Sequence, residues 1–446
     1  MRLHTHVVLP AMLVFVLSAC SVSRKLDQSA QQLILNEDGL KQAHVGISIY
    51  DPQKAVYLYN YQEDKYFIPA SNTKLFTLYS GMRYLGDSLP GIRYAETADS
   101  IYLLPTGDPS LLHPDFAVHP VIDFLKSNQK ELVIQQENWR EKELGYGWSW
   151  DDYNSSYMAE RSPLPVYGNI IRWTQVLEKS ESENGQLQNE AFVYSEPEVS
   201  WKVNFNPAKT SSFSVIRDRY SNQFTISEGK EILKTLEIPF VTNSLFSALD
   251  LLRDTIGRSI LLVPGENTRK ADRVLYSQPT DSLLKLMMLR SDNFYAEQVL
   301  LMASQQVYGY MNTRKMIDTI LKADLKGLPQ APNWVDGSGL SRYNLFTPVD
   351  MVWLLEKMER EFGRNRVDAI LASGGKGTLS NYYSDLGDAI KAKTGTLSGQ
   401  VALSGYLTTK KGKRLIFSVL VNNHQTSAVK VRRAMEAYLR KVWERY

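Results

Sequence analysis

The chain carries the stretch PASNTKLFTLYSGMRYL at residues 69–85. Its apolar residues recur at spacings of three and four, the period of an amphipathic helix. Small and polar residues open the segment, and Gly86 follows it as a stop signal. We therefore expect a helix that begins near Ser71, with Lys74 one turn further along on the same face.

The pattern Ser-x-x-Lys is weak evidence by itself, because it occurs six times in the chain. The copies begin at Ser71, Ser127, Ser227, Ser282, Ser373 and Ser427. A nucleophilic serine is well placed at a helix N-terminus, where free backbone N–H groups can stabilise an oxyanion. Only Ser71 begins a strongly amphipathic helix after a hairpin and a loop. The other copies are interpreted as solvated turns or helix surface.

Two further motifs accompany this serine. The pattern Ser-x-Asn occurs at residues 182–184, in a polar stretch that resembles a loop, and at residues 291–293, between two helical segments. The second position suits a catalytic loop. Lys-Thr-Gly occurs once, at residues 393–395, just before a strand-turn-strand pattern. We expect this third motif to lie on a sheet strand that faces a cleft.

Composition places the chain in the ordinary globular class. Its 446 residues are 43% hydrophobic and 22% charged, which permits a sizeable core. The net charge of +3 is too small to predict nucleic-acid binding, so no nucleic-acid partner is expected. A single cysteine excludes a disulfide framework, and the six histidines form no HxxxH pair. We expect neither a metal nor an organic cofactor.

The N-terminus has the pattern of an export signal. Arg2 precedes an apolar run from Val7 to Leu17, which suits the core of a secretory signal and is too short to span a bilayer. The following residues end in Cys20, the only cysteine, in a sequence that resembles a bacterial lipobox. We expect residues 1–20 to be a lipoprotein signal and Cys20 to be lipidated. The mature protein would be exported, periplasmic and anchored to a bacterial membrane. The alternative is an ordinary signal or anchor with a chance cysteine.

The spacing of apolar residues divides the remaining chain into three segments. Alternating runs at residues 45–50 and 55–59, joined by a turn, predict a β-hairpin. Residues 96–265 hold short strand-like runs and many turn residues, and are interpreted as an inserted β-rich region of one or two subdomains. The flanking segments 21–95 and 266–446 are expected to form the two parts of one domain.

Downstream of the insertion, the pattern predicts helices and then a strand-turn-strand-helix ending. The expected helices lie at residues 282–289, 295–307, 348–362 and 427–443, and the strands at 401–407 and 415–421. Two features of the sequence can each be interpreted in two ways. Residues 336–339 form either a simple tight turn or part of a cleft wall. Trp148 and Trp150 belong either to a glycan-binding surface or, as favoured, to the core of a small β domain.

In this order, the motifs at residues 71–74, 291–293 and 393–395 resemble the signatures of the serine penicillin-recognising enzymes. Further stretches are similar to the class C low-molecular-mass penicillin-binding proteins, at residues 107–111, 147–152, 291–297 and 336–342. The 220 residues from Ser71 to Ser291 match the large insertion of that family. The resemblance implies an α/β fold, a transpeptidase/β-lactamase-like sandwich of an antiparallel sheet with helices, interrupted by a large β-rich insertion.

The resemblance also implies catalytic roles. Ser71 is the expected nucleophile and Lys74 its candidate base, because a serine hydroxyl attacks poorly until a base takes its proton. An unperturbed lysine has a pKa of about 10.4, so desolvation and the nearby Lys393 are expected to lower the pKa of Lys74. Ser291 would relay a proton to the leaving amine. Asn293 would hold the substrate amide and orient Lys74.

Substrate-binding roles fall on the third motif and the residue after it. Lys393 and Thr394 are expected to bind the terminal carboxylate of the peptide. The backbone N–H groups of Ser71 and of Thr396, the residue after Gly395, are the expected oxyanion hole.

The implied function is that of a serine-type D-Ala-D-Ala carboxypeptidase or endopeptidase, which acts on peptidoglycan stem peptides through an acyl-enzyme on Ser71. β-Lactams are the expected covalent inhibitors, because they mimic the D-Ala-D-Ala terminus. One alternative is a β-lactamase or esterase on the same scaffold, against which the long insertion argues. The other is a non-catalytic, lipid-anchored cell-wall binding protein, against which the intact motifs argue.

Overall fold

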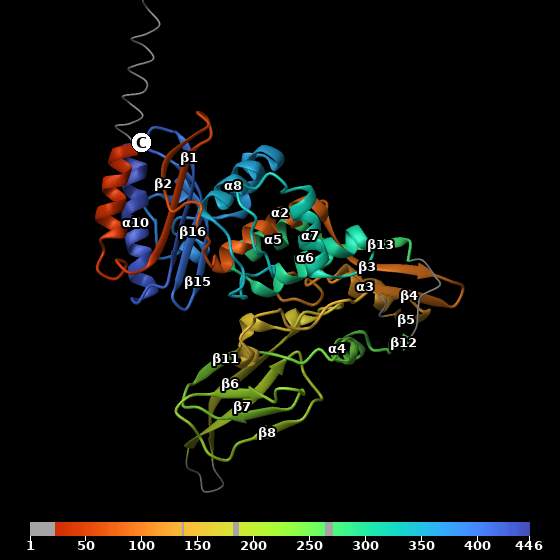
Figure 1. Ribbon diagram of the computed structural model, residues 1–446. Helices are drawn as coiled ribbons and strands as arrows, with labels where there is room; N and C mark the ends of the chain where they lie inside the picture. The colour runs from red at the N-terminus through yellow and green to blue at the C-terminus, as the bar shows by residue number, and fades with distance from the viewer. Residues whose placement is uncertain (1–22, 136–137, 182–186, 264–270) are drawn as a thin grey trace, which may run out of the picture. The chain divides into compact units, whose positions relative to one another are not determined.

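The computed structural model describes residues 23–135, 138–181, 187–263 and 271–446 (Figure 1). The expected signal and Cys20 lie outside these residues. The chain divides into two compact units. The first takes in the described residues up to Tyr79 with Leu284–Asp292 and Ile317–Tyr446, and the second takes in Ser80–Leu283 and Asn293–Met316.

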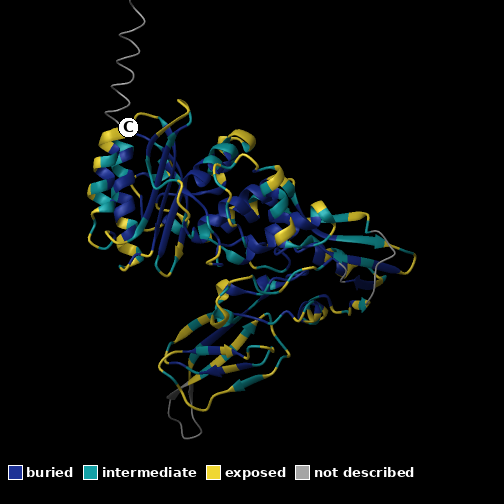
Figure 2. Ribbon diagram, viewed as in Figure 1, coloured by how far each residue is buried: buried dark blue, intermediate teal, exposed yellow. Residues whose placement is uncertain are grey.

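The first unit is built on a six-stranded antiparallel sheet in the order β14-β15-β16-β17-β1-β2. Its strands are β1 (His44–Asp51), β2 (Val56–Tyr61), β14 (Ala372–Ser373), β15 (Ile390–Leu397), β16 (Gln400–Thr408) and β17 (Arg414–Asn422). The predicted hairpin is β1–β2, and the predicted strand-turn-strand pattern is β16–β17. All nine residues of β17 are buried, as expected of a central strand with both faces covered (Figure 2).

Helices cover both faces of this sheet (Figure 1). On one face, α10 (Ala428–Arg445) packs beside the helical segment 23–35. The apolar residues of α10 that recur at helical spacing are all buried there, namely Val431, Met435, Tyr438, Leu439 and Val442. On the other face, α8 (Pro348–Phe362) contacts β17 and β1, and it has the bounds that the sequence predicts. Thr347 caps α8 and Ser427 caps α10, each by accepting a backbone N–H of the first turn.

The other helices that concern the motifs are α2 (Lys74–Tyr84), α5 (Thr280–Arg290) and α6 (Asn293–Tyr308), with α7 (Thr313–Ala323) and α9 (Arg364–Ile370) completing this part of the chain. Among the described residues, none of the helices combines the length and apolar character that crossing a bilayer requires. The mixed α/β class with an antiparallel sheet and helices is confirmed.

The second unit contains a five-stranded sheet in the order β12-β5-β4-β3-β13 and two three-stranded sheets, β11-β6-β7 and β8-β10-β9. The five-stranded sheet has β3 (Ser88–Glu96), β4 (Ser100–Pro105), β5 (Glu131–Gln135), β12 (Leu261–Val263) and β13 (Arg273–Pro279). The smaller sheets have β6 (Ile170–Glu181), β7 (Leu187–Glu196), β8 (Val203–Phe205), β9 (Ser214–Arg217), β10 (Phe224–Ser227) and β11 (Leu233–Pro239).

Two helices, α3 (Pro120–Ser127) and α4 (Phe246–Ile256), also lie in the region interpreted as β-rich, and they share its apolar core. One expectation about that core was wrong. Trp150 is 63% exposed, and the guanidinium of Arg219 lies 4.5 Å from its ring centroid. Trp150 starts a short 3-10 turn in which none of the residues is buried, so the indole has no apolar layer to enter.

Candidate active site

The first motif forms a tight turn that leads directly into a helix. Residues Ala70–Thr73 make a 3-10 turn, and α2 begins at Lys74. Ser71 is half-buried, whereas Lys74 is completely buried. The Lys74 ammonium donates to Ser71 Oγ at 3.0 Å and to the backbone oxygen of Ser338 at 2.7 Å. The serine and lysine of this copy of the motif are therefore in direct contact.

Two glycines allow the backbone of this turn to be enclosed. Ala70 has a left-handed φ of 48°, which is uncommon for a residue with a side chain. A β-carbon at Gly339 would lie 2.0 Å from the carbonyl oxygen of Ala70, and one at Gly395 would lie 2.6 Å from that of Pro69. Both approaches require glycine, so the turn that presents Ser71 is held between the loop that carries Gly339 and the strand that carries Gly395.

The loop at Asp336 supplies one of these glycines and part of the wall around Lys74. The Asp336 carboxylate accepts the backbone N–H groups of Gly339 at 2.8 Å and Ser341 at 2.7 Å. This turn directs the Ser338 carbonyl at Lys74 and the Gly337 carbonyl at Thr77 Oγ1, 2.7 Å away. The loop is thus both a tight turn and a site-lining segment.

The third motif lies on β15, next to the first. β15 pairs with β16 along its length but with β14 only at two residues, Lys391 and Ala392. The rest of this edge meets the turn that carries Ser71, where Asn72 Nδ2 donates to the Lys393 carbonyl at 3.0 Å. Asn72 is completely buried and was not singled out from the sequence. A lone asparagine inside Ser-x-x-Lys has no pattern that would mark it.

Lys393 joins the second and third motifs. Its completely buried ammonium donates to Ser291 Oγ at 2.8 Å and to the Thr394 carbonyl at 2.6 Å. Ser291 lies in the turn between α5 and α6, with a left-handed φ of 61°. The first unit therefore brings together the predicted residues Ser71, Lys74, Ser291 and Lys393.

The two lysines are electrostatically coupled. Burial lowers the pKa of the Lys393 ammonium well below its usual range, and repulsion from Lys74 lowers it further. Coulomb repulsion is mutual, so a buried pair of ammonium groups favours losing one proton. A neutral amine beside a hydroxyl is a base that a solvated lysine cannot supply at neutral pH.

The remaining predicted residues lie as follows. Asn293 is the first residue of α6 in the second unit, where its amide donates to the Tyr157 carbonyl at 3.0 Å. Its role in catalysis stays a prediction. Thr394 is half-buried and Thr396 exposed on β15. Thr396 Oγ1 accepts from Arg432 of α10 at 2.6 Å, a contact that the sequence did not suggest.

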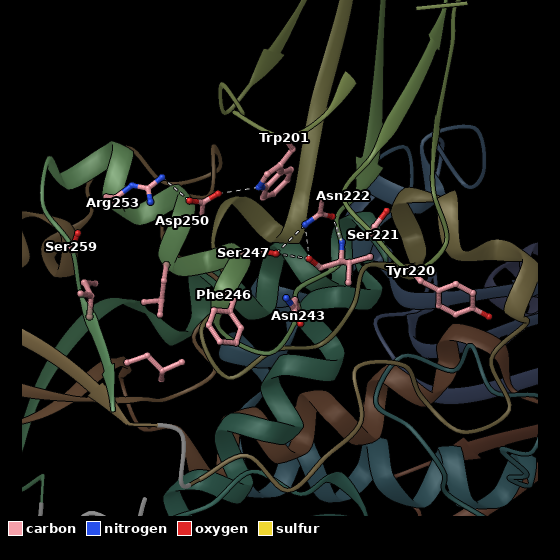
Figure 3. A pocket seen from close by; sticks show the side chains of 14 residues that line it. Trp201, Tyr220, Ser221, Asn222, Asn243, Phe246, Ser247, Asp250, Arg253 and Ser259 are labelled. Atoms are coloured by element: carbon pink, nitrogen blue, oxygen red, sulfur yellow. Dashed lines mark hydrogen bonds and ion pairs between the residues drawn. The ribbon is translucent and has the colours of Figure 1, made fainter. Parts of the chain in front are cut away.

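A separate cavity of about 610 Å³ lies in the second unit and contains none of the motif residues (Figure 3). Its polar side chains pair with one another. Trp201 Nε1 donates to Asp250 at 3.0 Å, Arg253 pairs with the same carboxylate at 2.6 Å, and Asn222 donates to Ser247 at 3.0 Å. Among the described residues, no group of three acidic, histidine or cysteine side chains is arranged to hold a metal ion.

Comparisons with known proteins show which family the chain belongs to. A family model described as the D-Ala-D-Ala carboxypeptidase 3 (S13) family matches residues 26–442. The D-alanyl-D-alanine carboxypeptidase of Actinomadura sp. (strain R39) is 26% identical over 441 residues, which cover 89% of this chain and 80% of that protein. The penicillin-sensitive carboxypeptidase A of Dictyostelium discoideum is 24% identical, covering 84% of this chain and 82% of its own.

The fold also has a solved counterpart. Penicillin binding protein 4 (dacB) from Haemophilus influenzae has a TM-score of 0.72 at 19% identity, covering 94% of this chain and 98% of that chain. The same protein complexed with a β-lactam has a TM-score of 0.67. Because the family model spans nearly all of the chain, the protein belongs to the D-Ala-D-Ala carboxypeptidase 3 (S13) family and is a serine-type D-Ala-D-Ala carboxypeptidase.

Proposed function

We propose that Ser71 is the nucleophile and Lys74 its base. The observation that carries this proposal is the 3.0 Å contact between Lys74 Nζ and Ser71 Oγ, made by a lysine with no exposed surface. Burial and repulsion from Lys74 lower the pKa of Lys393, and because this repulsion is mutual the pair favours losing one proton, which the base role needs.

The proposed reaction has two halves. Lys74 takes the proton of Ser71 as Oγ attacks the carbonyl carbon of the penultimate D-Ala. The oxyanion is held by the N–H groups of Ser71 and Thr396. The C–N bond then breaks, and Ser291 passes a proton to the departing amine of the terminal D-Ala. Asn293 holds the substrate amide. Water hydrolyses the resulting ester on Ser71 and restores the enzyme.

We further propose that the substrates are peptidoglycan stem peptides, with cross-linked peptides cleaved as well as linear ones. β-Lactams would acylate the same serine and leave slowly. The test is chromatography of muropeptides after incubation with the wild type and with Ser71→Ala. The wild type should release D-Ala from pentapeptides, and loss of cross-linked dimers would establish the endopeptidase activity. D-Ala release by Ser71→Ala would overturn the nucleophile assignment.

We also propose that the protein is exported to the periplasm and held at a membrane by a lipid on Cys20. This proposal rests on the lipobox-like sequence, and it fits an enzyme of cell-wall chemistry. Cell fractionation of the wild type and of Cys20→Ser tests it. The wild type should sediment with membranes and the variant should not. Equal distribution of both would contradict the anchor.

A further inference from the structure

Arg432 occupies an unusual position for a basic residue on a helix surface. Its neighbours on α10 are paired with carboxylates, Lys430 with Glu37 at 3.0 Å and Arg433 with Glu436 at 2.5 Å. Within the described part of the chain, Arg432 has no carboxylate within ion-pair distance. Its Nη2 instead donates to Thr396 Oγ1 at 2.6 Å. The guanidinium also lies 5.8 Å from the ring centroid of Tyr382, and its contact with Thr396 is exposed, so its charge is open to an anion from solvent.

The contact places this positive charge directly beside the third motif. Alternate residues of a strand project from the same face, so Thr394 and Thr396 lie on the side of β15 that also presents Ala392. Ala392 packs in the core that α10 covers. Thr394 and Arg432 also line one small hollow behind the strand. The hydroxyls of Thr394 and Thr396 and the Arg432 guanidinium therefore belong to one local surface.

The hydrogen bond also sets the direction of the Thr396 hydroxyl. A hydroxyl has one proton to donate, and a guanidinium can only donate. Since Thr396 Oγ1 accepts from Arg432, its own proton is left to point elsewhere, toward an acceptor. An arrangement of one oriented hydroxyl and one permanent cation suits a carboxylate.

Lys393 is a poor counter-ion for that carboxylate by itself. Two of its three N–H donors are directed at Ser291 Oγ and the Thr394 carbonyl. Its charge is also weakened, since burial and Lys74 lower the pKa of its ammonium. An arginine keeps its charge at all physiological pH values. Arg432 thus supplies a fixed positive charge beside the motif.

We propose that Arg432 is a specificity-determining residue, which orients Thr396 and attracts the free α-carboxylate of the residue that the enzyme releases. This inference rests on the proposed function, because it takes the third motif as the carboxylate site. It adds a residue of the C-terminal helix to that site and makes the carboxylate requirement depend on it.

The experiment compares two substrates on three variants. An acyl-D-Ala-D-Ala peptide with a free carboxylate is tested beside the same peptide as its C-terminal amide, with wild type, Arg432→Gln and Arg432→Lys. For the free acid, Arg432→Gln should lower kcat/KM about 10- to 100-fold, mainly through KM. For the amide the same change should alter kcat/KM less than about twofold, because no anion is bound. Arg432→Lys should restore part of the loss.

The matched control is Lys430→Gln, which removes the same charge two residues away on the same helix. It should leave both substrates unaffected, since Lys430 is paired with Glu37. Equal losses for acid and amide with Arg432→Gln would show a structural role and overturn the inference, as would no loss at all. Failure of the wild type to form an acyl-enzyme on Ser71 would instead overturn the proposed function, whatever the Arg432 variants do.

Discussion

Gly339 lies so close to Ala70 that a β-carbon on the glycine would be 2.0 Å from the alanine carbonyl oxygen. Ala70 precedes Ser71, the proposed nucleophile, and has a left-handed φ of 48°. Such a conformation persists only where the surroundings impose it, and it is a common feature of functional turns. The Asp336 loop that carries Gly339 therefore determines how Ser71 is presented.

This contact predicts that Gly339→Ala will slow acylation of Ser71 by at least about 100-fold, because a displacement of the nucleophile by an ångström has an effect of that size. The measurement is the second-order rate of acylation by benzylpenicillin. Gly412→Ala is the control. Gly412 has a left-handed φ of 76°, close to the 84° of Gly339, but nothing lies within 4 Å of the added methyl group. It should lose about 1 kcal/mol of stability and no activity. Normal acylation of a folded Gly339→Ala would contradict this role of the loop.

The contact between Lys393 and Ser291 predicts a second effect. Ser291→Ala removes the hydroxyl that accepts from Lys393 at 2.8 Å and that would pass a proton to the leaving amine. Turnover of a D-Ala-D-Ala peptide should fall about 100-fold, the usual share of one proton-transfer group. The variant should also lose about 1–3 kcal/mol of stability, because the buried Lys393 ammonium loses an acceptor. Stopped assays of D-Ala release measure the turnover. A loss below about threefold would exclude Ser291 from proton transfer.

The buried lysine pair makes stability depend on pH. The pKa of Lys393 is lower in the folded protein than in the unfolded chain, so between the two values the unfolded chain binds more protons. Stability contributed by this group therefore rises with pH above neutrality. Lys393→Gln should lack this rise and should be more stable than the wild type at pH 7, by about 1 kcal/mol.

Thermal unfolding at pH 7, 8, 9 and 10 compares the two proteins, and their difference should shrink as the pH rises. Lys391→Gln, two residues earlier on the same strand, is the control. Its stability should differ from that of the wild type by the same amount at each pH. A difference for Lys393→Gln that does not change with pH would contradict the electrostatic account of the site.

Asp108, in the second unit, predicts the opposite dependence of stability on pH. Its carboxylate is buried and accepts from the backbone and hydroxyl of Ser110 and from Ser277, and burial raises its pKa to about 6. Between its ordinary pKa of 3.8 and the raised one, the folded protein binds more protons, so stability falls as the pH rises. Asp108→Asn cannot ionise. Relative to the wild type it should gain about 2.4 kcal/mol of stability from pH 4 to pH 7, because pH 4 already lies just above the unfolded pKa.

Chemical unfolding at both pH values measures the gain, with the exposed Asp254→Asn as the control. A gain below about 1 kcal/mol for Asp108→Asn would mean that burial does not raise the pKa of the Asp108 carboxyl as described.

Two of the helices that cover the six-stranded sheet follow from local sequence. Pro348 and the Thr347 cap determine where α8 begins, and the apolar spacing around Met435 identifies the buried face of α10. The contact between Gly339 and Ala70 cannot be predicted in this way, because it joins backbones 269 residues apart and depends on tertiary packing. The exposure of Trp150 could not be predicted, because composition does not say which aromatic residues a small β domain encloses.

The site residues divide in the same way. Ser71, Lys74, Ser291 and Lys393 could be selected because each stands in a motif with a chemical reason for its spacing. Arg432 could not, since a basic residue on a helix surface looks the same whether it faces solvent or a catalytic strand. Only the fold brings it within 2.6 Å of Thr396.

The most direct test of the account is intact-protein mass spectrometry after incubation with benzylpenicillin, followed by peptide mapping of the adduct. If Ser71 is the nucleophile, the wild type should carry one covalent adduct, located on Ser71. Ser282→Ala should carry the same adduct, because it alters another copy of Ser-x-x-Lys. Ser71→Ala should form none while remaining folded. An adduct on another residue, or rapid loss of the drug without an adduct, would contradict the assignment of this site as a penicillin-sensitive D-Ala-D-Ala carboxypeptidase centre.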